Sequence, residues 1–405
     1  MSRNVVILGD PSPLLPLLKG ARFFAIVSQH DTRSLAADAR NFFQKIYSVE
    51  TEQEFDTTCF EKKLQELEDV LSQIQHEHGA VAGLVSINEH TVLPCAHLRR
   101  RFNIPGLDLE TAEICRDKLL MRERMNAVSP RVEYLDLERS SSRELSDFLR
   151  AHGPAVSKPR RQSSSLAVHV VHDEPELRTA GSTATLLEAF VDHPVMHLDG
   201  YALQGKVRFL VASHSAGTCL AYTTRGGTLG SVVVTDAHVY RQCLEFAQLT
   251  VDQLGLLQST FHIECFMSPD GLIFLEAGAR WGGGGIVDLV RYATGVDLSH
   301  AGYLIDANDD DMVNLPTRRS PPDHSVAMLN FSLPPDKRRF LGWHLSCCSG
   351  TRVLAVEARR VDEEIVRDDL DRFGAVLRVY IAGETDQEAM QALDHLTRHT
   401  EILYA

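Results

Sequence analysis

The chain contains no run of about 18 or more apolar residues, the length that a transmembrane helix needs, so we expect no membrane-spanning segment. The short apolar stretch at 5–8 ends at Gly9 and Asp10, which is typical of a first β-strand rather than of a signal peptide. Basic residues are also in the minority, because 41 Lys and Arg against 55 Asp and Glu leave a formal net charge of −14. Nucleic acids and anionic membranes favour basic surfaces, so we expect neither as a partner.

Paired cysteine motifs are missing as well. The eight cysteines are scattered, and no two have the CxxC spacing of zinc and redox sites. We therefore expect reduced, mostly buried thiols and a cytoplasmic location. With 405 residues, of which 44% are apolar and 24% charged, the chain is long enough for roughly two to three globular domains and needs no disulfide or metal to fold.

Strand and helix patterns alternate through the first part of the chain, which predicts a small doubly wound α/β domain over residues 1–110. No G-x-G-x-x-G turn follows the first strand, so we expect no dinucleotide site there. A helix is expected at 111–126, with Thr111 as its N-cap. Strand patterns dominate after residue 186, and the tail at 325–405 is expected to hold two or three strands and two helices.

The stretch 261–277 contains two strand patterns joined by the turn composition of residues 268–271. Folding this hairpin about Asp270 places Glu264 opposite Glu276. Like charges in such a pair are destabilising unless a cation lies between them, and paired carboxylates suit Mg²⁺. A register slip of one residue would instead turn the two acids to opposite faces, and the spacing alone leaves both possibilities open.

The residues after this hairpin favour the magnesium interpretation. Arg280 follows the second acid by four residues, where it can stabilise charge on a transferring phosphoryl group. Four glycines at 282–285 come next and allow the backbone to approach a ligand closely. Four glycines alone more often indicate a flexible loop, but after the E-x-x-x-R spacing they indicate a ligand site.

Two earlier segments also suit a nucleotide. Lys158 ends a short strand and precedes a small polar loop at 160–165, whose N–H and hydroxyl groups can bind phosphate oxygens, although in isolation such a loop is more often merely solvated. The segment 186–191 is either an edge strand with one exposed Glu or a linker whose backbone contacts the edge of an adenine ring. Lys118 lies on a charged helix face, which by itself indicates only solvation.

These motifs, in this order, resemble the ATP-grasp superfamily over about residues 80–300, and within it the carboxylate–amine ligases that build dipeptides from L-amino acids. The resemblance implies an α/β fold, α+β overall, in three parts. These are an N-terminal doubly wound α/β domain (1–110), a central lid subdomain (111–187) and a C-terminal antiparallel-sheet domain with an α+β extension (188–405).

The resemblance also implies a role for each motif. Mg²⁺ would be held by Glu264 and Glu276, with Arg280 as the catalytic residue at the γ-phosphate. Two departures stand out: Gly278 replaces the Asn that many members use as a third metal ligand, and serines replace glycines in the phosphate-covering loop. The ATP-binding residues implied are Lys118, Lys158, Ser163, Ser164, Ser165, Glu188, Ala189, Phe190 and Val191.

The implied reaction activates an amino acid or small carboxylic acid as an acyl phosphate, couples it to an amine and releases ADP and phosphate. A homodimer is the expected assembly, since dimers are the commonest soluble oligomers. His197 and Asp199 are expected to have ordinary structural roles. Two alternatives stay open: carboxylation through carboxyphosphate, and a non-catalytic nucleotide-binding protein, which the missing Asn and the altered loop favour slightly.

Overall fold

A computed structural model describes most of the chain, and all structural statements below refer to that part. None of the helices in it is both long and apolar enough to cross a membrane. All eight cysteines are free thiols and most are buried, as expected. The described residues are 3–9, 18–29, 32, 35, 37–51, 58–163, 165–181, 183–225, 227–332, 334, 337, 339–364 and 374–405.

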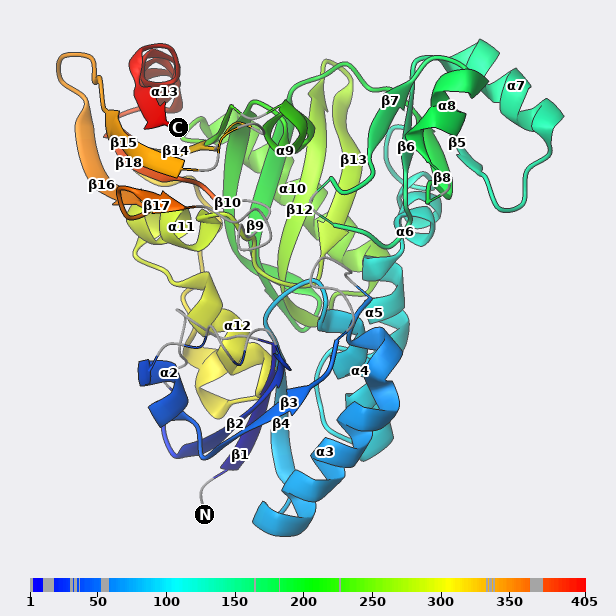
Figure 1. Cartoon of the computed structure of the whole chain (residues 1–405), viewed down its shortest axis with the longest axis vertical. Helices are drawn as coiled ribbons and strands as arrows, with labels where there is room; N and C mark the ends of the chain where they lie inside the picture. Colours follow the sequence, from blue (N-terminus) through cyan, green and yellow to red (C-terminus); the bar gives the residue numbers. More distant parts are fainter. Residues whose placement is uncertain are drawn as a thin grey trace.

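The N-terminal part is a four-stranded parallel sheet with helices packed on it, which confirms the predicted α/β domain (Figure 1). Its strands pair in the order β3 (Lys45–Val49), β2 (Ala21–Ser28), β1 (Arg3–Leu8) and β4 (Val81–Ser86). Apolar residues of the sheet and of α3 are buried together because the strands are apolar on both faces, as parallel strands usually are. The helices of this part are α2 (Ala37–Phe42), η1 (Glu61–Lys63), α3 (Leu64–His78) and α4 (Val92–Phe102).

Two short helices connect this part to the rest, where one helix had been predicted at 111–126. The chain forms α5 (Leu109–Arg116) and α6 (Lys118–Met125), and Asp117 between them has an extended backbone. The predicted N-cap Thr111 is also wrong, because the side chain of Asp108 accepts the hydrogen bond from the Thr111 N–H. Asp117 caps α6 by accepting from Leu119 N, so the break places Lys118 at a helix start.

A small antiparallel sheet follows, with two helices on it, at the upper right of Figure 1. Its strands pair in the order β5 (Tyr134–Asp136), β8 (Leu186–Ala189), β6 (Ala155–Lys158) and β7 (His169–Val171). Because β8 lies between β5 and β6, the edge-strand interpretation of this segment is wrong. The helices are α7 (Ser142–His152), which begins with a capping box at Ser141, and α8 (Glu174–Ala180).

The largest unit is an eight-stranded, mainly antiparallel sheet. Helix α10 (Ala237–Leu254) packs on one face, and α11 (Ile286–Thr294) and α12 (Leu298–Asp306) pack on the other, so that each face has its own apolar core. The short α9 (Cys219–Arg225) and η2 (Asp310–Asn314) lie in connections. The strand order is β13 (Gly271–Gly278), β12 (Gln258–Ser268), β9 (Val195–Leu203), β10 (Lys206–Ala216), β11 (Thr228–Val233), β14 (Ser325–Phe331), β18 (Leu377–Gly383) and β16 (Arg352–Ala358).

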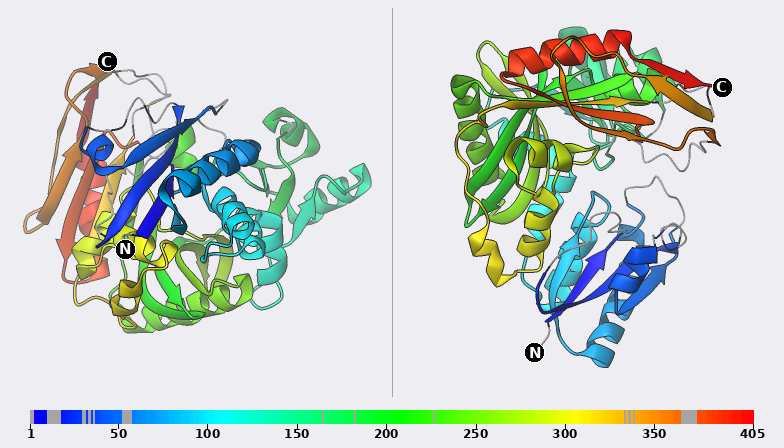
Figure 2. Two further views of the ribbon diagram at one scale, coloured as in Figure 1. Left: turned by 90° about the horizontal axis from the view of Figure 1, so that it is seen from below. Right: turned by 90° about the vertical axis from the view of Figure 1, so that its left-hand side faces the viewer.

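The tail differs from its prediction of two or three strands and two helices. It contributes three strands to the large sheet and three more to a small separate sheet, while its described residues form a single helix, α13 (Asp386–His399), packed on β14 and β18 (Figure 2). The separate sheet pairs β17 (Glu363–Glu364), β15 (Arg339–His344) and β19 (Glu401–Tyr404). The extra strands were missed because a strand such as β16, exposed at both ends, lacks a regular alternation of apolar and polar residues.

Candidate active site

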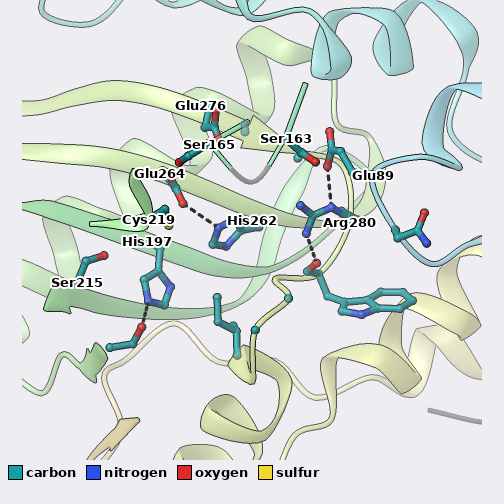
Figure 3. A pocket seen from close by; sticks show the side chains of 18 of the residues that line it. Glu89, Ser163, Ser165, His197, Ser215, Cys219, His262, Glu264, Glu276 and Arg280 are labelled. Atoms are coloured by element: carbon teal, nitrogen blue, oxygen red, sulfur yellow. Dashed lines mark hydrogen bonds and ion pairs between the residues drawn. The ribbon is translucent and has the colours of Figure 1, made fainter. Parts of the chain in front are cut away.

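A cavity of about 310 Å³ opens where the N-terminal part, the small sheet's loop and the large sheet meet. Its wall includes the residues that follow β4, the start of α6, strands β12 and β13, and the glycine-rich turn that follows β13. Figure 3 shows many of these side chains pointing toward one another across the cavity. Its charged and polar lining residues include Glu89, Arg116, Lys118, Ser163, Ser165, His197, His262, Glu264, Glu276 and Arg280.

The two acids of the β12–β13 hairpin face each other. Glu264 pairs directly with Glu276 in the ladder, as predicted, but the register next to the turn differs from the predicted one by one residue, since Ser268 pairs with Gly271. A bulge between Glu264 and Cys265 shifts the pairing by one residue and thereby brings the two acids opposite each other. Both side chains line the cavity and are partly buried, so the two oxygen-bearing groups that Mg²⁺ prefers are present on one wall.

Lys118 reaches the same wall from the start of α6. Its Nζ lies 3.6 Å from Glu276 Oε2 and donates a hydrogen bond to the carbonyl oxygen of Gln162. The backbone N–H of Lys118 also donates to the carbonyl of Arg160, at 3.1 Å. One lysine therefore links the second acid of the hairpin to the loop at 160–165.

That loop is held down by Asp117, the residue at the helix break. Arg160 donates from Nε and from a terminal nitrogen to the two oxygens of Asp117, at 2.8 and 2.6 Å. Two parallel hydrogen bonds between a guanidinium and a carboxylate fix orientation as well as distance. Ser163 and Ser165, predicted to cover phosphate, line the cavity beyond this clamp, whereas Ser164 lies outside the described residues.

Lys158 lies apart from the cavity lining, in a buried ionic cluster. Its Nζ is 2.6 Å from Glu188 Oε2, and Arg122 Nε donates to the other oxygen of Glu188 at 3.0 Å. Arg122 also donates to the carbonyl of Phe274 at 2.6 Å, so it joins the small sheet to β13. Burial would raise the pKa of Glu188, but Lys158 and Arg122 lower it to about 2. Burial next to Arg122 lowers the pKa of Lys158 even though Glu188 opposes the shift.

The residues predicted to contact adenine lie next to this cluster. Glu188 and Ala189 are the last residues of β8, and the N–H of Ala189 donates to the carbonyl of Glu133 at 2.9 Å. Phe190 has an exposed side chain, and its N–H donates to the carbonyl of Pro154 at 3.1 Å. Val191 is half-buried. This segment is thus separate from the cavity that holds Lys118, Glu264, Glu276 and Arg280.

Arg280 enters the cavity from the residues after β13 and is held by Glu89. Its Nε donates to Glu89 Oε2 at 2.7 Å (Figure 3), and Arg116 donates to Glu89 Oε1 at 2.5 Å. Burial would raise the pKa of Glu89, but the charges of Arg116 and Arg280 lower it to about 2. Glu89 is therefore an ionised carboxylate between two guanidinium groups on the cavity wall.

The glycine-rich turn after β13 packs its backbone tightly against neighbouring side chains. Gly285 has a φ of +96°, and a Cβ there would lie 2.6 Å from both Arg378 Nε and Met328 Sδ. A Cβ at Gly282 would lie 2.7 Å from Asp199 Oδ1, whereas one at Gly283 would meet nothing within 4 Å. Glycine is therefore needed at 282 and 285, and Gly283 faces open space in the cavity.

Two histidines share one aspartate beneath the hairpin. Asp199, which is fully buried on β9, accepts from His197 Nδ1 at 2.6 Å and from His262 Nδ1 at 2.8 Å. The other nitrogen of His262 is 3.3 Å from Glu264 Oε1. Burial would lower the pKa of His262, but Asp199 and Glu264 raise it to about 10. Likewise His262 and His197 outweigh burial and hold the pKa of Asp199 well below its usual range.

The predicted site did not include three charged residues that line the cavity, Glu89, His262 and Arg116. The positions of the first two in the sequence could have indicated them. Glu89 closely follows the carboxyl end of β4, where open α/β sheets bind ligands. His262 precedes Glu264 by two residues, so it had to share the face of β12 that carries the acid. Arg116 could not be predicted in this way. Its orientation depends on the helix break at Asp117, which is stabilised by Arg160, a residue distant in sequence.

The three units and the cavity between them make up the ATP-grasp fold. Among proteins with this fold, the chain resembles the carboxylate–amine ligases and, within these, the L-amino acid ligases. No protein-family model matches the chain. The L-arginine-specific L-amino acid ligase of Bacillus subtilis is 23% identical over 359 residues, which cover 80% of this chain and 81% of that protein.

Solved structures lead to the same fold. The L-amino acid ligase from Bacillus licheniformis superimposes with a TM-score of 0.74 at 18% identity, covering 100% of this chain and 99% of that one. The biotin carboxylase domain of the 2-oxoglutarate carboxylase from Hydrogenobacter thermophilus, in complex with MgADP, ADP and bicarbonate, has a TM-score of 0.69 at 14% identity. It covers 98% of this chain and 90% of that chain.

Proposed function

We propose that the chain is an ATP-dependent carboxylate–amine ligase that converts an amino acid or small carboxylic acid to an acyl phosphate and couples it to an amine. The observation that supports this most is the direct pairing of Glu264 with Glu276 on a cavity wall that also carries Lys118 and Arg280. Two facing acids destabilise a sheet, and a bound cation offsets that cost. The likeness to two L-amino acid ligases supports the same activity.

In this proposal, Glu264 and Glu276 would hold Mg²⁺, which would supply positive charge next to the phosphates of ATP. Lys118 exchanges the carbonyl of Gln162 and the carboxylate of Glu276 for phosphate oxygens. Arg280 stabilises the charge that develops as the substrate carboxylate attacks the γ-phosphorus. Glu89 keeps the guanidinium of Arg280 oriented during that step.

The remaining residues act on the substrates and on water. The loop at 160–165 covers the acyl phosphate and keeps water out, which prevents its hydrolysis before the amine attacks. Adenine would lie at 188–191, next to Lys158, and Ser163 and Ser165 would contact phosphate oxygens.

A screen of pairs of amino acids and small acids tests the proposal. ATP and Mg²⁺ are supplied, phosphate release is measured, and products are identified by mass spectrometry. The expected result is phosphate release that requires both partners and yields a product lighter than their sum by one water. Glu276→Gln is the matched control and should abolish ADP formation while leaving the fold intact. Pair-independent ATP binding without turnover would instead support a non-catalytic nucleotide-binding protein.

A carboxylase-type reaction is the second candidate, since a biotin carboxylase domain shares the fold over nearly the whole chain. It would activate bicarbonate as carboxyphosphate in the same cavity. ATP hydrolysis that depends on bicarbonate, with no response to amine, would favour it over the ligase.

A further inference from the structure

The ladder between β12 and β13 places a histidine opposite the position where a metal ligand is missing. His262 pairs with Gly278, and the next pair on the same face is Glu264 with Glu276. In the ATP-grasp resemblance, position 278 is where an Asn would supply a third ligand. The imidazole of His262 is therefore on the same cavity wall as the two acids, directly across the ladder from position 278, where the Asn side chain is absent.

Hydrogen bonds orient this imidazole toward the acids. Figure 3 shows Nε2 of His262 directed at Glu264, with Oε1 at 3.3 Å, while Nδ1 lies 2.8 Å from Asp199 Oδ1. Metal-binding histidines typically donate from one ring nitrogen to a carboxylate, which fixes the ring, and bind the ion through the other nitrogen, so the proton that His262 Nε2 shares with Glu264 would be released to solvent when the ion binds. Asp199 is fully buried and is held in turn by His197, so the ring of His262 is fixed from behind.

We propose that Nε2 of His262 is the third protein ligand of the metal site, with Glu264 and Glu276, and replaces the missing amide of position 278. The inference rests on the proposed function, because it concerns the ion that the two acids would hold. Asp199 is a positioning residue in this arrangement, and His197 supports Asp199 without contacting the ion. The Nε2 of His197 is 2.9 Å from Ser231 Oγ, which directs it away from the acids.

A nitrogen ligand changes which ion the site prefers. Mg²⁺ favours oxygen ligands and dehydrates reluctantly, whereas imidazole suits transition metals. We therefore expect Mn²⁺ to bind more tightly than Mg²⁺. A separate site built from His197, Asp199 and His262, whose ligand atoms lie within 4.8 Å of one another, is the competing arrangement. In that case both histidines, and not His262 alone, would contact the ion.

Pulsed electron paramagnetic resonance of Mn²⁺ bound to the full chain with ADP tests the proposal directly. Unlabelled protein and protein carrying ¹⁵N-histidine are compared, so that the wild-type chain alone gives an answer. One directly bound imidazole nitrogen should be detected, and it should persist in His197→Ala and vanish in His262→Ala. Coupling to two histidines would support the competing site, and Mn²⁺ bound with no histidine coupling would overturn the proposal.

A rescue variant provides a second measurement. Calorimetric titration should show Mn²⁺ binding weakened by about 10- to 100-fold in Asp199→Asn, and at least as much in His262→Ala. A Cβ at Gly278 would lie 3.4 Å from Glu89 Oε2, an ordinary contact, so Asn can be introduced there. His262→Ala combined with Gly278→Asn should restore binding with a preference for Mg²⁺.

The outcomes separate this inference from the proposed function. Unchanged Mn²⁺ affinity in His262→Ala would overturn the histidine ligand, whereas amide formation by the wild type would still support the ligase. If Mn²⁺ with ADP does not bind at all, even to the wild type, the metal site fails and the proposed function fails with it. Thermal unfolding of each variant identifies any loss of binding that comes from loss of the fold.

Discussion

The ammonium nitrogen of Lys158 lies 2.6 Å from a carboxylate oxygen of Glu188, and both side chains are almost fully buried. Arg122 completes the cluster from α6. The lysine expected to bind phosphate is thus neutralised by the acid expected near adenine. ATP binding at this place requires Lys158 to exchange part of its contact with Glu188 for a phosphate oxygen.

Replacing Glu188 by Gln should destabilise the chain strongly. The substitution leaves two buried cations without their counter-charge, and breaking such a buried pair costs about 3–5 kcal/mol. Urea unfolding measures the effect as a lower free energy of unfolding. Glu110→Gln is the matched control, because Glu110 pairs with Arg124 on the surface, where ion pairs contribute about 0–1 kcal/mol. Equal effects of the two substitutions would contradict the buried cluster.

The loss of folding stability at acid pH should depend in part on Glu89. Its pKa is about 2 in the folded chain and 4.5 in the absence of partners, so its contribution is fully present above pH 4.5 and is lost as the pH falls toward 2. A shift of this size corresponds to about 3 kcal/mol. The free energy of unfolding of Glu89→Gln should therefore fall less steeply between pH 4.5 and 2 than that of the wild type. The free energy of unfolding is measured by urea unfolding at several pH values. If it falls with pH equally steeply in the wild type and in Glu89→Gln, the arginine contacts of Glu89 are ruled out.

Loosening the loop at 160–165 should uncouple ATP use from amide formation. Arg160→Ala removes two charge-assisted hydrogen bonds to Asp117, and a loss of about 1–2 kcal/mol would raise the open population roughly 5- to 30-fold. Water then reaches the acyl phosphate, so the ratio of ADP to amide product should rise. Arg139→Ala, at a highly exposed position paired with Asp136, is the control. An unchanged ratio in Arg160→Ala would show that this clamp does not close the site.

Two neighbouring glycines should respond differently to the same substitution. Gly285→Ala places a methyl group against Arg378 and Met328 at a positive φ, which should lower the free energy of unfolding by about 1–3 kcal/mol. Gly283→Ala meets nothing within 4 Å and should change it by less than about 0.5 kcal/mol. Urea unfolding of both variants measures the difference, and similar values would contradict the packing described for this turn.

Local features of the site could be predicted from the sequence, whereas long-range ones could not. The hairpin that carries Glu264 and Glu276 could be predicted from its turn composition, although their direct pairing also depends on the bulge after Glu264, which the turn does not set. The contact of Lys158 with Glu188 depends on how β6 and β8 align, which no pattern within either strand determines. The break at Asp117 escaped prediction because the helical pattern continues through it, and Arg160, distant in sequence, stabilises the extended residue.

A crystal structure with Mg²⁺ and a non-hydrolysable ATP analogue tests the central claim most directly. We expect carboxylate oxygens of both Glu264 and Glu276 to coordinate a metal ion that also contacts the β- and γ-phosphates. An analogue bound with its phosphates and metal elsewhere, while the two carboxylates remain without an ion, would contradict the account.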